Sequence, residues 1–213
     1  MSTVSKEVET GTTTLGLVCK DGVVLAADRR ATAGTLIAHK HTKKVYKLDE
    51  NLGLTTAGLV GDLQVLARYI TAEVELYKLK RGVTMPVEAC ATLTANILSG
   101  SRFYPYWVQL VIGGWDRAGG HVYSLDAAGG SLPDKFVSSG SGSPYVYGVL
   151  EDHFKDDMLT EDGANLAIRA VTAAMKRDAV SGEGIDVAII TKDGFKMLDD
   201  KEVEKRKLSM KLT

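Results

Sequence analysis

The chain has 213 residues, of which 45% are hydrophobic and 25% are charged, and its formal net charge is -1. These proportions match those of globular proteins and exclude a disordered or fibrous chain. The near balance of charge gives no reason to expect nucleic acid or an anionic membrane as a partner.

The first quarter of the chain is predicted to be mostly β-sheet. Residues 12–19 (TTTLGLVC) are β-branched and apolar, and residues 23–27 (VVLAA) are continuously apolar. Asp21-Gly22 lies between these runs as a hairpin turn, so the two runs predict paired strands. A second pair is predicted at residues 44–48 and 52–57, joined by a short polar turn.

From residue 62 the apolar residues recur at the period of a helix. One helix is predicted with Asp62 capping its first turn and Gly82 ending it. A second follows Pro86, which suits a first helical turn. The two apolar stripes consist of Leu63, Leu66, Ala67, Ile70, Val74 and Tyr77, and of Val87, Cys90, Ala91, Thr94, Ile97 and Leu98. We expect these helices to lie side by side.

Strands return in the second half of the chain. They are predicted at residues 107–113, 121–125, 135–138 and 186–191. Between the last two, a helical stripe follows Thr160 as a candidate cap and consists of Ala164, Ala167, Ile168, Val171, Ala174 and Met175. The charged tail at 199–207 is typical of a solvated helix face. This order is an α+β pattern in which helices could cover two sheets from outside, within one domain.

The two cysteines, Cys19 and Cys90, each lie in an apolar stretch, which favours small buried thiols over a disulfide or a metal site. His39 and His41 alternate along a predicted strand, but no nearby third ligand completes a metal set, so we expect no metal and no cofactor. The first eleven residues lack the apolar core of a secretory signal, and no stretch approaches the roughly 20 apolar residues of a membrane span. We therefore expect a soluble, cytoplasmic protein.

The leading candidate for chemistry is the run Gly11-Thr12-Thr13-Thr14. A threonine hydroxyl is a weak nucleophile unless a base takes its proton, and a free α-amino group, with a pKa of roughly 7.7 to 8.0, can be that base. Exposing such an amine on Thr12 requires cleavage after Gly11, whose missing Cβ leaves the carbonyl open to attack. On the triplet alone, the simpler interpretation is three threonines that begin an exposed strand.

Five further motifs give the triplet its context: DRR at 28–30, KKV at 43–45, AGLVGD at 57–62, SGSGS at 139–143 and RDAVSG at 177–182. In this order and at these intervals, the chain resembles the catalytic beta subunits of archaeal-type proteasomes from about residue 11 to residue 191. The resemblance implies a four-layer αββα sandwich of the N-terminal-nucleophile hydrolase type. It also implies that residues 1–11 are a propeptide removed by autocleavage and that residues 12–213 form a single catalytic domain.

By this resemblance Thr12 is the nucleophile, Lys44 is the cation beside it, and Asp28 holds Lys44 in place. A buried ammonium disfavours a second positive charge nearby and so lowers the pKa of the Thr12 amine. Neighbouring strand residues point to opposite faces, so only one of Lys43 and Lys44 can face the nucleophile. Without the resemblance, two solvated lysines explain the sequence equally well.

Further roles follow from the resemblance. Gly58 resembles the oxyanion-hole residue, whose main-chain N–H faces the carbonyl oxygen as it gains charge; alternatively it is a glycine between a strand and a helix. Ser141, Asp178 and Ser181 resemble the group that orients the amine and a nucleophilic water, whereas SSGSGS alone is typical of a flexible turn. Arg30 matches a residue that braces this region, or it is an ordinary surface arginine.

The implied function is that of a threonine-type endopeptidase, which degrades unfolded proteins inside a closed chamber through an acyl-enzyme. The implied assembly consists of seven-membered beta rings capped by proteasome alpha subunits and fed by a regulatory unfolding ATPase. The positions that match the substrate pocket are Ala31, Thr42, Tyr46, Thr56 and Val60. None is charged and most are small, which favours large apolar side chains and a chymotrypsin-like preference.

Two alternatives stay open, namely a relative of the bacterial two-ring type and a non-catalytic ring subunit that keeps its leader. A serine hydrolase of the α/β-hydrolase fold is disfavoured, because SSGSGS lacks the G-x-S-x-G order of a nucleophile elbow.

Overall fold

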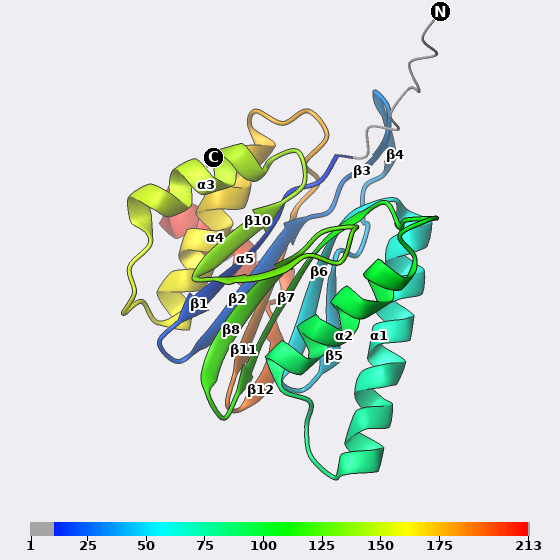
Figure 1. Ribbon diagram of the computed structural model, residues 1–213. Coiled ribbons are helices and arrows are strands. Elements are labelled where there is room, and N and C mark those ends of the chain that lie inside the picture. Colours follow the sequence, from blue (N-terminus) through cyan, green and yellow to red (C-terminus); the bar gives the residue numbers. More distant parts are fainter. Residues whose placement is uncertain (1–10, 213) are drawn as a thin grey trace, which may run out of the picture.

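The computed structural model describes residues 11–212, and it stacks two antiparallel five-stranded sheets face to face with helices on both outer faces (Figure 1). The first sheet has the order β10 (Phe136–Ser139), β1 (Thr14–Cys19), β2 (Gly22–Asp28), β11 (Ile185–Thr191) and β12 (Gly194–Met197). The second has the order β5 (Val45–Asp49), β6 (Leu52–Gly58), β7 (Val108–Asp116), β8 (Gly119–Leu125) and β9 (Ser131–Asp134). A separate hairpin pairs β3 (Ala31–Ala33) with β4 (Leu36–His39).

Helices cover the sheets as the α+β pattern predicts. α1 (Val60–Arg81) and α2 (Val87–Gly100) pack on the second sheet, while α3 (Ser143–His153), α4 (Thr160–Met175) and α5 (Asp200–Ser209) lie on the side of the first (Figure 1). The four-layer αββα sandwich is therefore confirmed. No helix within residues 11–212 combines the length and apolar character needed to cross a bilayer.

The alternation of side chains along β2 explains how the layers are held together. Val24 and Ala26 face the α4 layer, whereas Val23, Leu25 and Ala27 fill the space between the two sheets. All five are fully buried. Full burial of one aliphatic side chain contributes about 1.5–3 kcal/mol, so this strand anchors two cores at once.

Leu25 packs against glycines of both sheets. A Cβ added at Gly16, Gly53 or Gly113 would lie 2.9, 2.7 and 2.9 Å, respectively, from the Leu25 side chain. These three glycines come from β1, β6 and β7, on both sides of the interface. The leucine therefore occupies the space that three absent side chains leave.

Two predicted helix caps are wrong. α1 begins at Val60 with no side-chain cap, and the carboxylate of Asp62 instead accepts the Trp107 N–H (2.9 Å). Thr160 is the first residue of α4 rather than its cap, and its N–H and hydroxyl both donate to the carboxylate of Asp21 (2.8 and 3.0 Å). The β1–β2 turn thus caps α4, an interaction between distant residues that local patterns do not show. The predicted end of α1 at Gly82 is confirmed, with φ 69°.

The sequence did not predict β3, β9, β12 and α3, and it predicted only the end of β4, at His39. The strands are three or four residues long and mostly exposed, so they lack an alternating apolar pattern. α3 buries only Val146 and Leu150, too few for a recognisable stripe. Strand β4 ends at His39, so the predicted strand through His41 is wrong.

Candidate active site

Thr12 lies two residues before β1, which pairs with β10 and β2 in the first sheet, and its side chain is buried. Its hydroxyl donates to the carbonyl oxygen of Gly11 (Oγ1 to O, 2.7 Å). Its amide nitrogen donates to Ser141 Oγ (3.1 Å), and its carbonyl accepts from the Gly142 N–H (3.3 Å). The hydroxyl is therefore in contact with the peptide bond whose cleavage the sequence predicts.

Asp28, the last residue of β2, is fully buried and accepts four hydrogen bonds. Its Oδ1 accepts from Lys44 Nζ (2.7 Å) and from the Thr13 N–H (2.9 Å). Its Oδ2 accepts from the N–H groups of Arg30 (3.0 Å) and Gly182 (2.9 Å). One carboxylate thereby joins the nucleophile strand, the lysine and the 178–182 turn.

The structure distinguishes the two neighbouring lysines. Lys44 is buried against Asp28, whereas Lys43 is exposed and lies over the ring of Tyr46, with Nζ 5.1 Å from the ring centroid. Burial lowers the pKa of Lys44, and the negative charge of Asp28 opposes that shift. The Lys44 ammonium can therefore release a proton more readily than an exposed lysine.

A chain of hydroxyl groups connects Thr12 to Asp178. Ser141 Oγ and Ser181 Oγ both donate to Asp178 Oδ2 (2.7 and 2.6 Å). Because the Ser181 proton is committed to this carboxylate, Thr13 Oγ1 must be the donor in its 2.7 Å contact with Ser181. Ser141 in turn is left to accept from the Thr12 nitrogen, so the orientation of that nitrogen depends on Asp178.

Arg30 clamps the turn that carries these groups. Its guanidinium donates to the Ala179 carbonyl (2.7 Å) and pairs with Glu183 (3.3 Å). A Cβ added at Gly182 would lie 2.5 Å from the same guanidinium. The structure therefore places Arg30 as a brace beneath the site rather than as a free surface residue.

Gly58 ends β6 with φ +131°, a conformation that side chains rarely adopt. A Cβ at this position would lie 2.0 Å from the Trp107 carbonyl oxygen, which also accepts the Leu59 N–H (2.9 Å). Only glycine fits, and its main chain lines the same cavity as Thr12. This placement suits an oxyanion-binding residue.

A small cavity of about 30 Å³ brings most of the predicted residues together. It is lined by Gly11, Thr12, Ala31, Thr32, Thr42, Lys43, Lys44, Tyr46, Gly58, Val60 and Leu63. Thr56 does not line it, contrary to the sequence prediction, because Thr56 is fully buried and its N–H donates to the Lys44 carbonyl (3.0 Å). Thr32 and Leu63 also line the cavity; neither was predicted as a site residue, and Leu63 was predicted only as part of the apolar stripe of α1.

The SSGSGS segment packs closely against Thr12 and Thr13. A Cβ at Gly140 would lie 2.1 Å from the Thr12 carbonyl oxygen, and one at Gly142 would lie 1.8 Å from Thr13 Oγ1. The alternating glycines thus allow the loop to pack directly on the nucleophile segment. The alternation of glycine with serine was the sequence feature that could have predicted this close packing.

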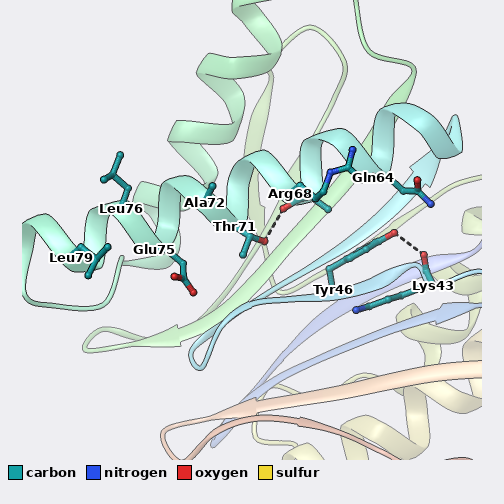
Figure 2. Close-up of a pocket in the computed structure, with 10 residues that line it drawn as sticks. Lys43, Tyr46, Gln64, Arg68, Thr71, Ala72, Glu75, Leu76 and Leu79 are labelled. Atoms are coloured by element: carbon teal, nitrogen blue, oxygen red, sulfur yellow. Dashed lines mark hydrogen bonds between the residues drawn. The ribbon is translucent and has the colours of Figure 1, made fainter.

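A larger groove of about 730 Å³ runs along α1, as Figure 2 shows. Lys43 and Tyr46 line both this groove and the smaller cavity, and the Tyr46 hydroxyl donates to the Lys43 carbonyl (3.0 Å). Tyr46 therefore belongs to the lining of both cavities. Burial raises the pKa of Tyr46, so its hydroxyl stays neutral.

Within residues 11–212, no cluster of three or more His, Cys, Asp or Glu side chains is placed to hold a metal ion. The two thiols are buried and unpaired, and burial raises the pKa of each to about 12.

Comparison with known proteins agrees with this geometry. The sequence matches the proteasome subunit family over residues 8–190. A protein named proteasome subunit beta from Methanothermobacter thermautotrophicus is 52% identical over 197 residues, covering 92% of this chain and 94% of that protein. The proteasome subunit beta of Thermoplasma acidophilum is 52% identical over 204 residues (95% and 96%), and that of Archaeoglobus profundus is 49% identical over 203 residues (95% and 94%). This chain therefore belongs to the proteasome subunit family, as a beta subunit of the 20S core and a threonine-type endopeptidase.

Proposed function

We propose that the chain activates itself by cutting the bond between Gly11 and Thr12. The observation that carries this proposal is the 2.7 Å contact between Thr12 Oγ1 and the Gly11 carbonyl oxygen, inside a buried site that also anchors the Thr12 nitrogen. The hydroxyl oxygen bonds to the Gly11 carbonyl carbon, the C–N bond breaks, and the hydroxyl proton is transferred to the departing nitrogen. Water then hydrolyses the resulting ester, which releases residues 1–11 and leaves a free amine on Thr12.

The same hydroxyl then attacks substrate peptides. The new amine takes the hydroxyl proton and passes it to the leaving nitrogen of the substrate, while the Gly58 N–H stabilises the oxyanion. Lys44 keeps a positive charge near the amine and lowers its pKa, so that the amine is unprotonated near neutral pH. Water releases the acyl group and restores Thr12.

Substrate preference follows from the cavity walls. Ala31, Thr42, Tyr46 and Val60 are uncharged and line the cavity beside Thr12, which supports a chymotrypsin-like preference for large apolar residues before the cut. In the uncleaved chain the cavity has room for about one water molecule, and Gly11 is part of its wall. Departure of the leader enlarges it. Fluorogenic peptides ending in Tyr or Leu should be cleaved faster than those ending in acidic or basic residues, and the reverse order would refute the preference.

For the assembly we propose seven-membered beta rings capped by proteasome alpha subunits, fed with unfolded protein by a regulatory ATPase in the cytoplasm. The support is the similarity to proteins named proteasome subunit beta. Electron microscopy of the particle formed with alpha subunits should show sevenfold symmetry. A sixfold particle would indicate the bacterial two-ring type instead.

Intact mass of the assembled chain tests the central proposal. We expect loss of Met1 to Gly11, whereas a retained leader combined with full peptidase activity would contradict the mechanism. Thr12→Ala should abolish both self-cleavage and peptide hydrolysis, and Thr12→Ser, which keeps a hydroxyl, should retain part of each. A non-catalytic ring subunit would keep its leader and show no peptidase activity in any of these forms.

A further inference from the structure

The residue before the nucleophile is in direct contact with the 178–182 turn. Gly11 is buried, and a Cβ built on it would lie 1.7 Å from Val180 Cγ2, 2.1 Å from Val180 Cβ and 3.1 Å from Val180 Cγ1. Separations below 3.0 Å do not occur between real atoms of this kind, so any side chain at residue 11 requires Val180 to move. Val180 therefore fills the space that a side chain on residue 11 would need.

Val180 cannot move freely, because its turn is fixed on three sides. Its own N–H donates to Asp178 Oδ1 (3.3 Å), and the carbonyl of Ala179 accepts from the guanidinium of Arg30 (2.7 Å). On the other side, the Gly182 N–H donates to the buried carboxylate of Asp28 (2.9 Å). Displacing Val180 would disturb hydrogen bonds that involve charged groups, each worth about 1.5–3 kcal/mol.

The carboxylate of Asp178 also sets the position of Thr12, on the other side of the Gly11–Thr12 bond. Asp178 Oδ2 accepts from Ser141 Oγ, which accepts from the Thr12 nitrogen. Asp178 thus fixes Val180 through one oxygen and Thr12 through the other. The carbonyl of residue 11 is in contact with the Thr12 hydroxyl.

From this geometry we infer that Val180 is a positioning residue for self-cleavage, which admits only glycine at residue 11 and holds its carbonyl against the Thr12 hydroxyl. The inference rests on the proposed self-cleavage and adds the residue that selects the cleavage site. A side chain at residue 11 would meet Val180 and move the carbonyl away from Oγ1. A displacement of about 1 Å is enough to slow such a reaction by about two orders of magnitude.

A suppressor experiment tests the inference, with self-cleavage of the full-length chain followed over time by intact mass. Gly11→Ala should slow cleavage by at least about tenfold, a loss of about 1.4 kcal/mol in transition-state stabilisation. Adding Val180→Gly, which removes both clashing atoms and the third close atom, Cγ1, should recover most of that rate. Adding Val180→Ala, which leaves the Cβ contact at 2.1 Å, should recover less, and adding the isosteric Val180→Thr should recover none.

Ala179→Gly is the matched control, because it loosens the same turn without removing any of the three atoms nearest to the added Cβ, all of which belong to Val180. In the Gly11→Ala background it should not restore cleavage. The inference would be overturned if Ala179→Gly restored cleavage as well as Val180→Gly does. It would also be overturned if Val180→Gly restored none in a chain that is folded, as judged by a cooperative thermal transition. If the Val180→Gly chain does not fold, the Val180→Ala and Val180→Thr pair decides, since the inference requires the alanine variant to be faster.

These outcomes are separable from failure of the proposed function. If the unaltered chain keeps its leader yet hydrolyses peptides, self-cleavage itself is wrong. If the unaltered chain is cleaved but the Gly11→Ala chain is cleaved equally fast, self-cleavage stands and the role of Val180 is wrong.

Discussion

Replacing Asp28 by asparagine should destabilise the fold and inactivate the enzyme through one buried group. The carboxylate accepts from Lys44 Nζ and from three main-chain N–H groups, those of Thr13, Arg30 and Gly182. An asparagine amide keeps one acceptor oxygen, so its NH₂ group faces two of the four donors whichever way it is turned. The lysine also loses its anion while it stays buried.

Breaking a buried ion pair on one side costs about 3–5 kcal/mol. For a chain of this size, 1 kcal/mol corresponds to roughly 2–4 °C in Tm, so we expect Tm to fall by about 6–20 °C. The assays are thermal unfolding, which gives Tm, and urea unfolding, which gives the free energy; both use the uncleaved Thr12→Ala chain, with and without Asp28→Asn, and follow tryptophan fluorescence. Self-cleavage and peptidase activity of the Asp28→Asn chain should both fall by at least about a hundredfold, because Lys44 and Thr13 lose their shared anchor.

A second substitution separates the charge from the lost hydrogen bonds. Adding Lys44→Met to Asp28→Asn removes the unpaired ammonium, and the free energy of unfolding should recover by at least about 1 kcal/mol. The deficit of the Asp28→Asn chain should also shrink as pH rises from about 7 towards 10. Burial keeps the pKa of Lys44 below its unfolded value of about 10.4, so the unfolded chain binds more protons in this range and stability increases with pH. No recovery with Lys44→Met, together with a pH-independent deficit, would refute the argument from charge.

Three further predictions concern the cavity and the thiols. Gly58→Ala should lower kcat in a peptidase assay by about 10²–10³-fold, because the added Cβ would meet the Trp107 carbonyl. The control is Gly61→Ala, whose Cβ meets open space and which should leave kcat within about twofold. Tyr46→Ala should join the catalytic cavity to the groove along α1, so kcat/KM for peptides with Trp before the cut should rise relative to that for peptides with Leu. Tyr46→Phe keeps the ring and should leave this ratio unchanged. The same ratio in both variants would contradict the role of Tyr46 in both linings. Cys19 and Cys90, buried and with pKa values raised to about 12, should resist iodoacetamide at pH 8 in the native protein and react after denaturation, as mass spectrometry can show.

The sequence predicted the fold where side-chain patterns are regular. The continuous apolar run of β2 reflects burial on both faces and the stripe of α1 reflects burial on one, and both are visible in the order of residues alone. The cap of α4 was not visible, because it is a contact between Asp21 and Thr160, 139 residues apart. Interactions of that kind depend on how the elements pack, which local propensity does not encode.

In the candidate site, too, motifs were predictable from the sequence, whereas contacts between distant residues were not. The residue types around Thr12 and the resemblance of five motifs predicted Lys44 and Asp28, and the structure joins them at 2.7 Å. Strand alternation could not choose between Lys43 and Lys44, because both precede the first residue of β5. The contact between Gly11 and Val180 joins segments 169 residues apart and involves an apolar side chain without chemistry of its own, so no sequence motif pointed to it.

The bonds that fix Thr12 have a consequence for the timing of activation. Its carbonyl accepts from Gly142, the next residue binds Asp28, and β1 is paired on both sides from Thr14 onward. All of these anchors lie on the C-terminal side of the nucleophile, so severing the chain at its N-terminal side removes none of them. For the proposed cleavage, we therefore expect the cut chain to need no refolding before its first turnover.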